Sequence, residues 1–248
     1  MSSPKVVLIT GAGGDLGRGF TSVFARAGYS VAGIDIDESA LDRFSAAAVA
    51  AGAEHLPIKC DLRDWSQIEQ AVETAAKRFG RIDVIINNAT ARTSPTMKPL
   101  EDCSAAEFDA IVSVGPRAAL GVMRAVLPYL KEVQGKVINI GSGAGYSGAA
   151  GLGPYGMSKA ALHTLTFSAA LEWGPHGITV NGILPLALTD TMASVMEKDG
   201  KVQLHLPPIG RMGEVERDIG ALALFLASPE ADYISGQNIS ADGGMTRR

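Results

Sequence analysis

"KVVLITGAGGDLGRGF", residues 5–20, joins a run of aliphatic and β-branched residues to a helix-like segment through a cluster of glycines. The first part, residues 5–10, has the composition of a buried strand. Glycines between a strand and a helix let the backbone approach a phosphate group, which then lies at the positive N-terminus of the helix. Ordinary tight turns also use glycine, so the meaning of this turn depends on the rest of the chain.

The same strand-then-helix pattern repeats along the whole sequence. Most of the candidate strands are apolar throughout, which is typical of strands buried on both faces of a parallel sheet. We predict strands at 5–10, 30–36, 55–62, 84–89, 136–142, 178–185 and 237–242, and helices at 16–28, 38–51, 65–79, 105–132, 156–173 and 214–227. This alternation predicts an α/β fold, a doubly wound parallel sheet of Rossmann-like type, formed by residues 1–248 as a single domain.

Composition excludes several classes of protein. The 248 residues are 46% hydrophobic and 19% charged, with a net charge of −4, and no basic run suggests a nucleic-acid partner. We see no uninterrupted apolar stretch long enough to span a membrane and no signal peptide, so we expect a cytoplasmic protein. Cys60 and Cys103 are isolated and are expected to be buried thiols, and the four histidines have no metal-ligand spacing.

An acidic residue ends the second predicted strand. Asp35, in "GIDID", follows Gly17 by eighteen positions. A carboxylate there can accept hydrogen bonds from the adenine ribose and would repel a 2′-phosphate. The turn itself offers no basic residue for that phosphate, and Arg18, nearby, should lie inside the helix. These residues favour NAD over NADP, although Asp35 could also be a solvated turn residue.

Further motifs follow in order at the predicted strand ends. They are Thr10-Gly11…Gly17, Asp61 closing strand three, "NNA" at 87–89, Ser142 at the end of strand five, Tyr155-x-x-x-Lys159, "VN" at 180–181, Pro185 and "ADGG" at 241–244. With these motifs the chain resembles the short-chain dehydrogenase/reductase family from Lys5 to about Met245. The combination is specific, whereas each motif alone would be weak.

The resemblance implies a catalytic set of Ser142, Tyr155 and Lys159. Tyr155 would act as acid and base, Lys159 would assist it and bind the nicotinamide ribose, and Ser142 would hold the substrate oxygen. The physical reason is electrostatic: an ammonium about 4 Å from a phenolate contributes roughly 4 kcal/mol at a dielectric of about 20. That energy lowers the pKa of a phenol by up to about three.

The resemblance also implies which residues bind the cofactor, NAD. They are Gly11, Asp15, Leu16, Gly17, Asp35, Asp61, Leu62, Asn88, Ala89, Tyr155, Lys159 and Pro185. Thr90, Gly143 and Leu186 are the predicted substrate contacts, and residues from about 187 to 212 resemble a substrate lid. No metal is implied.

Two departures from the family pattern bear on activity. Asp15 replaces a glycine; we expect it to cap the helix, although it could instead point toward the ribose hydroxyls. Gly115 replaces an asparagine whose helix kink, in the family, frees a carbonyl for a proton-relay water. Gly115-Pro116 can bend the helix by another route, because proline lacks an N–H. The competing interpretation is a slowed or altered catalyst.

The leading hypothesis is therefore an NAD-dependent oxidoreductase that interconverts a small secondary alcohol and a ketone. One alternative is an NADPH-dependent 3-oxoacyl-thioester or ketone reductase, and another is a nucleotide-binding protein with lost or altered catalysis. The resemblance further implies a homotetramer or dimer built on helices 105–132 and 156–173.

Overall fold

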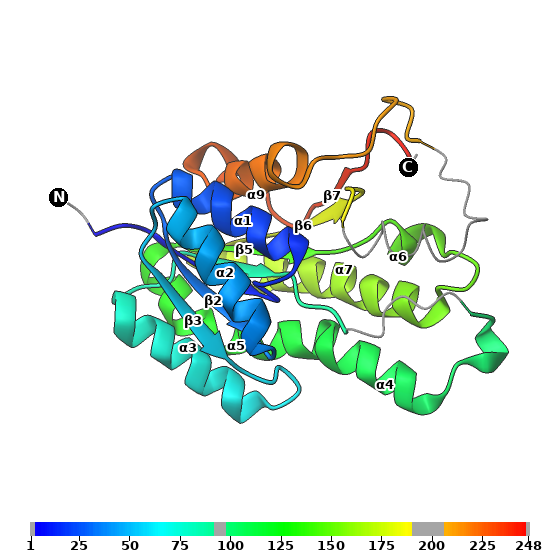
Figure 1. Cartoon of the computed structure of the whole chain (residues 1–248), viewed down its shortest axis with the longest axis horizontal. Coiled ribbons are helices and arrows are strands. Elements are labelled where there is room, and N and C mark those ends of the chain that lie inside the picture. Colours follow the sequence, from blue (N-terminus) through cyan, green and yellow to red (C-terminus); the bar gives the residue numbers. More distant parts are fainter. Residues whose placement is uncertain (1–2, 92–97, 190–205, 247–248) are drawn as a thin grey trace.

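A parallel sheet of seven strands, in the order β3-β2-β1-β4-β5-β6-β7, runs through the centre of the molecule (Figure 1). The computed structural model describes residues 3–91, 98–189 and 206–246. The strands are β1 (Val6–Thr10), β2 (Ser30–Asp35), β3 (His55–Lys59), β4 (Val84–Asn87), β5 (Lys136–Ile140), β6 (Thr179–Pro185) and β7 (Asn238–Ala241). After β1 the chain adds β2 and β3 on one side of the sheet, and after β4 it adds β5, β6 and β7 on the other side. The topological switch point therefore lies between β1 and β4. The predicted doubly wound fold is confirmed.

Helices cover both faces of the sheet (Figure 1). One face carries α1 (Asp15–Arg26), α2 (Glu38–Ala50) and α9 (Ala221–Leu226), and the other carries α3 (Trp65–Phe79), α5 (Pro116–Val133) and α7 (Gly153–Trp173). Phe20, Phe24 and Phe44 are fully buried in the first layer, and Met123 and Leu130 in the second. Each such side chain contributes about 1.5–3 kcal/mol by leaving water. The two layers explain why the strand sequences are apolar throughout.

The predicted strands at 55–62, 84–89 and 136–142 are too long at their C-terminal ends, whereas those at 5–10 and 178–185 end where predicted. The structure ends β3 at Lys59, β4 at Asn87 and β5 at Ile140. The residues that follow, including Asp61, Asn88 and Ser142, leave the sheet and form loops at its carboxyl edge. This is the edge where ligands bind in open parallel sheets.

The predicted helix over 105–132 is two helices. α4 (Ala105–Val114) ends at Gly115, whose φ of −81° and ψ of −111° are not helical, and α5 begins at Pro116. Proline suits the first position of a helix because its missing N–H would have no partner there. The expected bend at Gly115-Pro116 is thus a full break.

Three smaller differences concern the helices. α6 (Ala144–Ser147) is a short helix after Ser142 that the sequence did not predict. α7 begins at Gly153, earlier than expected, with Pro154 in its first turn. The predicted helix over 214–227 begins with a π-helical turn, η3 (Val215–Gly220), before α9. Short 3-10 turns are η1 (Leu100–Asp102), η2 (Gly174–His176) and η4 (Pro229–Ala231).

We expected no apolar stretch long enough to span a membrane, but the stretch Ala105–Val133, taken as one helical unit, meets that criterion. Among the residues that the structure describes, it is the one helical stretch long and apolar enough to cross a membrane, by length and composition only. Core helices pass the same test, and α5 packs its Val122, Met123 and Val126 against the sheet. The stretch is therefore weak evidence for a membrane span.

The two cysteines differ in environment. Cys60 is buried, as expected, and burial raises the pKa of its thiol to about 11. Cys103 is only half-buried, so the expectation of two buried thiols is wrong for Cys103.

Candidate active site

The glycine turn after β1 leaves no room for a side chain at Gly11 or Gly17. Gly11 has a positive φ of 62°, and a Cβ there would lie 2.9 Å from the Cα of Ala89. A Cβ on Gly17 would lie 2.3 Å from the carbonyl oxygen of Gly11. Helix α1 starts directly after this turn, and its N-cap Gly14 makes no side-chain cap. The first N–H groups of α1 therefore point to the carboxyl edge of the sheet, as a phosphate site requires.

Asp15 is not the N-cap that we expected, because Gly14 takes that position and Asp15 is the first residue of α1. Its carboxylate accepts a hydrogen bond of 2.6 Å from Nη2 of Arg18, one helical turn later. Arg18 lies inside the helix, as predicted. The ion pair offsets the negative charge that Asp15 brings near the glycine turn.

Asp35 lies at the end of β2 and contacts the glycine turn. Its Oδ2 accepts a hydrogen bond of 3.2 Å from the N–H of Gly13, and its Oδ1 accepts one of 3.2 Å from the N–H of Asp37. On the other side, Nε of Arg43 donates to the carbonyl oxygen of Gly13 at 3.4 Å. The sequence did not predict a role for Arg43, because its position on α2, one turn after Ser39, is the only sign of this contact.

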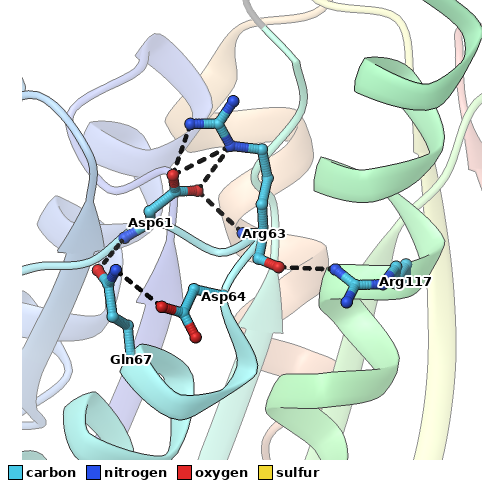
Figure 2. Close-up of polar contacts among 5 residues, drawn as sticks. All are labelled: Asp61, Arg63, Asp64, Gln67 and Arg117. Carbon is cyan, nitrogen blue, oxygen red and sulfur yellow. Dashed lines mark hydrogen bonds and ion pairs between the residues drawn. The ribbon is translucent and has the colours of Figure 1, made fainter. Parts of the chain in front are cut away.

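Asp61 is held by an arginine (Figure 2). Nε and Nη2 of Arg63 both donate to the Asp61 carboxylate, and these hydrogen bonds lower the pKa of Asp61 below its ordinary value. Gln67 accepts from the N–H of Asp61 at 3.0 Å, and Arg117 donates to the carbonyl oxygen of Arg63 at 2.7 Å. The carboxylate thus lies in a fixed position at the sheet edge, while an adenine contact for Asp61 stays a prediction.

Two of the predicted cofactor residues, Asn88 and Ala89, make hydrogen bonds within the protein that hold the glycine turn. Nδ2 of Asn88 donates to the carbonyl oxygens of Thr10 and Gly11, both at 3.0 Å, and so fastens the glycine turn to the end of β4. The N–H groups of Asn88 and Ala89 both donate to Oγ1 of Thr10. Leu62 places its side chain in the hydrophobic core, so only its backbone is available at the edge.

Ser142, Tyr155 and Lys159 lie on two elements that touch. Nζ of Lys159 donates to the carbonyl oxygen of Ile140 at 2.7 Å and lies 5.6 Å from the centre of the Tyr155 ring. Ser142 follows Ile140 by two residues, and its Oγ accepts a hydrogen bond of 3.2 Å from the N–H of Ala144. The hydroxyl hydrogen of Ser142 is therefore available to donate.

Close packing of α6 on α7 fixes this arrangement. A Cβ on Gly145 would lie 2.8 Å from the backbone nitrogen of Ala160, and one on Gly156 would lie 2.9 Å from the carbonyl oxygen of Ala144. The loop with Ser142 thus lies directly against the turn of α7 that carries Tyr155 and Lys159.

The helix break at Gly115 has a defined neighbour. A Cβ on Gly115 would lie 2.5 Å from Oγ of Ser158 and 2.9 Å from the carbonyl oxygen of Ile111. A larger residue would not fit without movement. Because Pro116 has no N–H, the carbonyl of Val112 has no helical donor at the next turn.

The predicted substrate contacts lie around the same edge. Thr90 is exposed, Leu186 lies directly after β6 and the Pro185 that ends it, and a Cβ on Gly143 would lie 3.2 Å from Oγ1 of Thr246. The C-terminal segment thus reaches the loop of Ser142. Residues 190–205 of the predicted lid lie outside the described residues.

The chain is similar to known proteins over nearly its whole length. A family model described as Enoyl-(Acyl carrier protein) reductase matches residues 11–246. A 12alpha-hydroxysteroid dehydrogenase of Clostridium sp. is 35% identical over 254 residues, covering 98% of this chain and 97% of that protein. A 3-oxoacyl-(acyl-carrier-protein) reductase of Thermotoga maritima is 34% identical over 248 residues, covering 97% of each.

A solved structure of NAD+-bound xylitol dehydrogenase superposes with a TM-score of 0.90 at 27% identity, covering 98% of this chain and 99% of that one. These matches run over nearly the whole chain, and their fold is the one that the sheet order shows. The chain therefore belongs to the short-chain dehydrogenase/reductase family of oxidoreductases.

Proposed function

We propose that this oxidoreductase interconverts a small secondary alcohol and a ketone with NAD(H) as its cofactor. The observation that carries the cofactor assignment is the position of Asp35, which ends β2 and hydrogen-bonds the amide of Gly13 in the glycine turn. A carboxylate fixed there favours the ribose diol of NAD and repels a 2′-phosphate.

The residues present fit a dinucleotide. Gly11 and Gly17 keep side chains out of the turn, and the uncapped start of α1 offers N–H groups to a pyrophosphate. Asp15 would oppose that phosphate, but Arg18 pairs with it. Asp61, at the same edge, would face the adenine together with Arg63.

Three side chains would carry the proton chemistry. In alcohol oxidation, the phenolate oxygen of Tyr155 takes the hydroxyl proton of the substrate while Ser142 donates a hydrogen bond to the substrate oxygen. The Lys159 ammonium, held by the Ile140 carbonyl, stabilises that phenolate. When bound, the nicotinamide supplies the chemistry of hydride acceptance from the carbinol carbon. The reverse direction returns the proton from Tyr155 to the substrate oxygen.

The approach of the loop with Ser142 to α7 supports an active enzyme over a nucleotide-binding protein with lost catalysis. Gly115 lacks the asparagine side chain that the family has at this position, but the break at Pro116 leaves the carbonyl of Val112 without a helical donor. That carbonyl is the backbone group that a proton-relay water would use here.

Arg43 favours a second candidate, an NADPH-dependent ketone reductase such as a 3-oxoacyl-thioester reductase. Its guanidinium lies at the Gly13 carbonyl, beside Asp35, and could pair with a 2′-phosphate if it moved. We rank this second, because Asp35 is already fixed at the same position.

The remaining proposals concern substrate and assembly. Thr90, Gly143 and Leu186 would border a modest, uncharged substrate, and no nucleic acid, membrane or metal enters the proposal. Met157, Phe167 and Leu171 are exposed apolar residues of α7, with Leu171 81% exposed, which supports a homotetramer or dimer through this helix. We place the protein in the cytoplasm.

The test is turnover by the purified protein with NAD and, separately, NADP. The panel would contain a straight-chain secondary alcohol, a cyclic alcohol, a polyol and a hydroxysteroid, with Tyr155→Phe as the control. We expect at least one alcohol to reduce NAD faster than NADP, and Tyr155→Phe to abolish this. Equal rates in the variant, or turnover only with NADP, would contradict the proposal.

A further inference from the structure

A buried imidazole lies directly behind the loop that carries Ser142. His163 is on α7, one turn after Lys159, and is 3% exposed. Its Nε2 accepts a hydrogen bond of 3.5 Å from the backbone N–H of Ser142. The same ring stacks on Tyr146, with ring centres 4.4 Å apart and planes 24° from parallel. Contacts on both Ser142 and Tyr146 set this residue apart from a simple core side chain.

The loop is shaped to the ring. A Cβ on Gly141 would lie 2.6 Å from Nε2 of His163, and a Cβ on Gly145 would lie 2.7 Å from its Cε1. Both distances are too short for real side chains, so both glycines are required by the position of the imidazole. Ser142 lies between these glycines, and its backbone therefore cannot shift without disturbing the contact with His163.

We propose that His163 is a positioning residue, which sets where the Ser142 hydroxyl faces the substrate. The proposal rests on the proposed function, since Ser142 must contact substrate for its position to matter. The ring acts through its shape and as an acceptor for the Ser142 N–H. An accepting Nε2 assigns the neutral tautomer with the proton on Nδ1.

If His163 only filled the core, its substitution would lower the stability of the protein, and its effect on kcat would not depend on the Ser142 side chain. The hydrogen bond from the Ser142 N–H to Nε2 of His163 is long, at 3.5 Å. Two variants therefore test separately the loss of the acceptor atom and the loss of the ring shape. His163→Gln keeps an acceptor on a flexible side chain, whereas His163→Leu keeps bulk without an acceptor. His176→Leu, on the exposed η2 turn, is the matched control.

The kinetic test is a double-mutant cycle with Ser142→Ala, using the panel alcohol with the highest kcat/KM. We expect His163→Leu to lower kcat by up to roughly tenfold, the effect of one ordinary hydrogen bond. We expect His163→Gln to recover part of that loss, with NADH affinity unchanged. In the Ser142→Ala background the same His163→Leu change should alter kcat by less than about twofold. Equal losses in both backgrounds would overturn the proposal.

A second measurement does not depend on turnover. NMR of the imidazole nitrogens of the full protein at neutral pH, with His163 assigned through the loss of its signals in His163→Gln, reports which nitrogen carries the proton. An unprotonated Nε2 supports the proposal, and a protonated Nε2 overturns it even if His163→Leu fails to fold. An enzyme without activity on the whole panel would contradict the proposed function, while the NMR result would still decide the role of the ring.

Discussion

The ammonium of Lys159 donates a 2.7 Å hydrogen bond to the carbonyl oxygen of Ile140, the last residue of β5. This bond joins α7 to the strand from which the Ser142 loop starts. Lys159 is only 6% exposed, and its Nζ lies 5.6 Å from the centre of the Tyr155 ring.

Lys159→Met should remove the charge and keep most of the side-chain volume. We expect kcat to fall by about 100-fold or more, in the range of a lost acid–base contribution. The Ile140 carbonyl would lose its donor at a cost of about 1–3 kcal/mol in the free energy of unfolding. Steady-state kinetics and urea unfolding check both effects, with exposed Lys131→Met as the control. A kcat within threefold of the wild-type value would contradict the role of Lys159.

Gly115→Ala should destabilise the protein, because the new Cβ would meet Oγ of Ser158 and the carbonyl of Ile111. Overpacking of this kind costs about 1–3 kcal/mol. The matched control is Gly174→Ala, since Gly174 has helical backbone angles and open space around its Cβ position. Urea unfolding would measure the two free energies of unfolding. A Gly115→Ala protein as stable as the control would refute the close packing at the helix break.

Ser104 and Glu107 form a capping box at the N-terminus of α4, which gives a pH-dependent prediction. Lys98 and the Ser104 N–H hydrogen-bond the Glu107 carboxylate and lower its pKa from 4.5 to about 2. A lowered folded-state pKa contributes stability above the unfolded value, and this is lost as pH falls through the folded value. Wild type should therefore exceed Glu107→Gln in Tm at pH 6, with the difference shrinking between about pH 4.5 and 2. Thermal unfolding across this range checks it, and a difference independent of pH would contradict the assignment.

Asp35→Asn should change cofactor choice while keeping an acceptor for the Gly13 N–H. Without the charge, we expect NADPH to bind at least about tenfold tighter than to wild type, a change of about 1.4 kcal/mol. Arg43→Ala in that background should reverse part of the gain, since Arg43 would be the phosphate partner. Fluorescence titrations measure both, with exposed Asp42→Asn as the control. Unchanged NADPH affinity in Asp35→Asn would show that Asp35 does not select the cofactor.

Much of the fold could be predicted because the strands of a parallel sheet are buried on both faces and therefore read as continuous apolar runs. The glycine turn and Asp35 were also visible, since their positions after β1 and β2 follow from chain order. Helix ends were less predictable: Asp15 looked like a cap, but Gly14 takes that position.

The missed residues act through contacts that span long stretches of sequence. His163 reaches Ser142 across twenty-one positions and Arg43 reaches Gly13 across thirty. An isolated histidine on a helix carries no sequence signal for such a contact, because only the packing of α6 on α7 brings the ring beneath the loop. The glycines at 141 and 145 were the one trace of it in the sequence.

Titration of the purified wild-type protein with NADH and with NADPH, followed by nicotinamide fluorescence, shows whether Asp35 makes this a NAD(H) enzyme. We expect saturable NADH binding at least about tenfold tighter than NADPH binding, which corresponds to about 1.4 kcal/mol. Tighter binding of NADPH would contradict the account and favour the reductase with Arg43 as its phosphate partner. Binding of neither cofactor would contradict it as well and favour a protein without turnover.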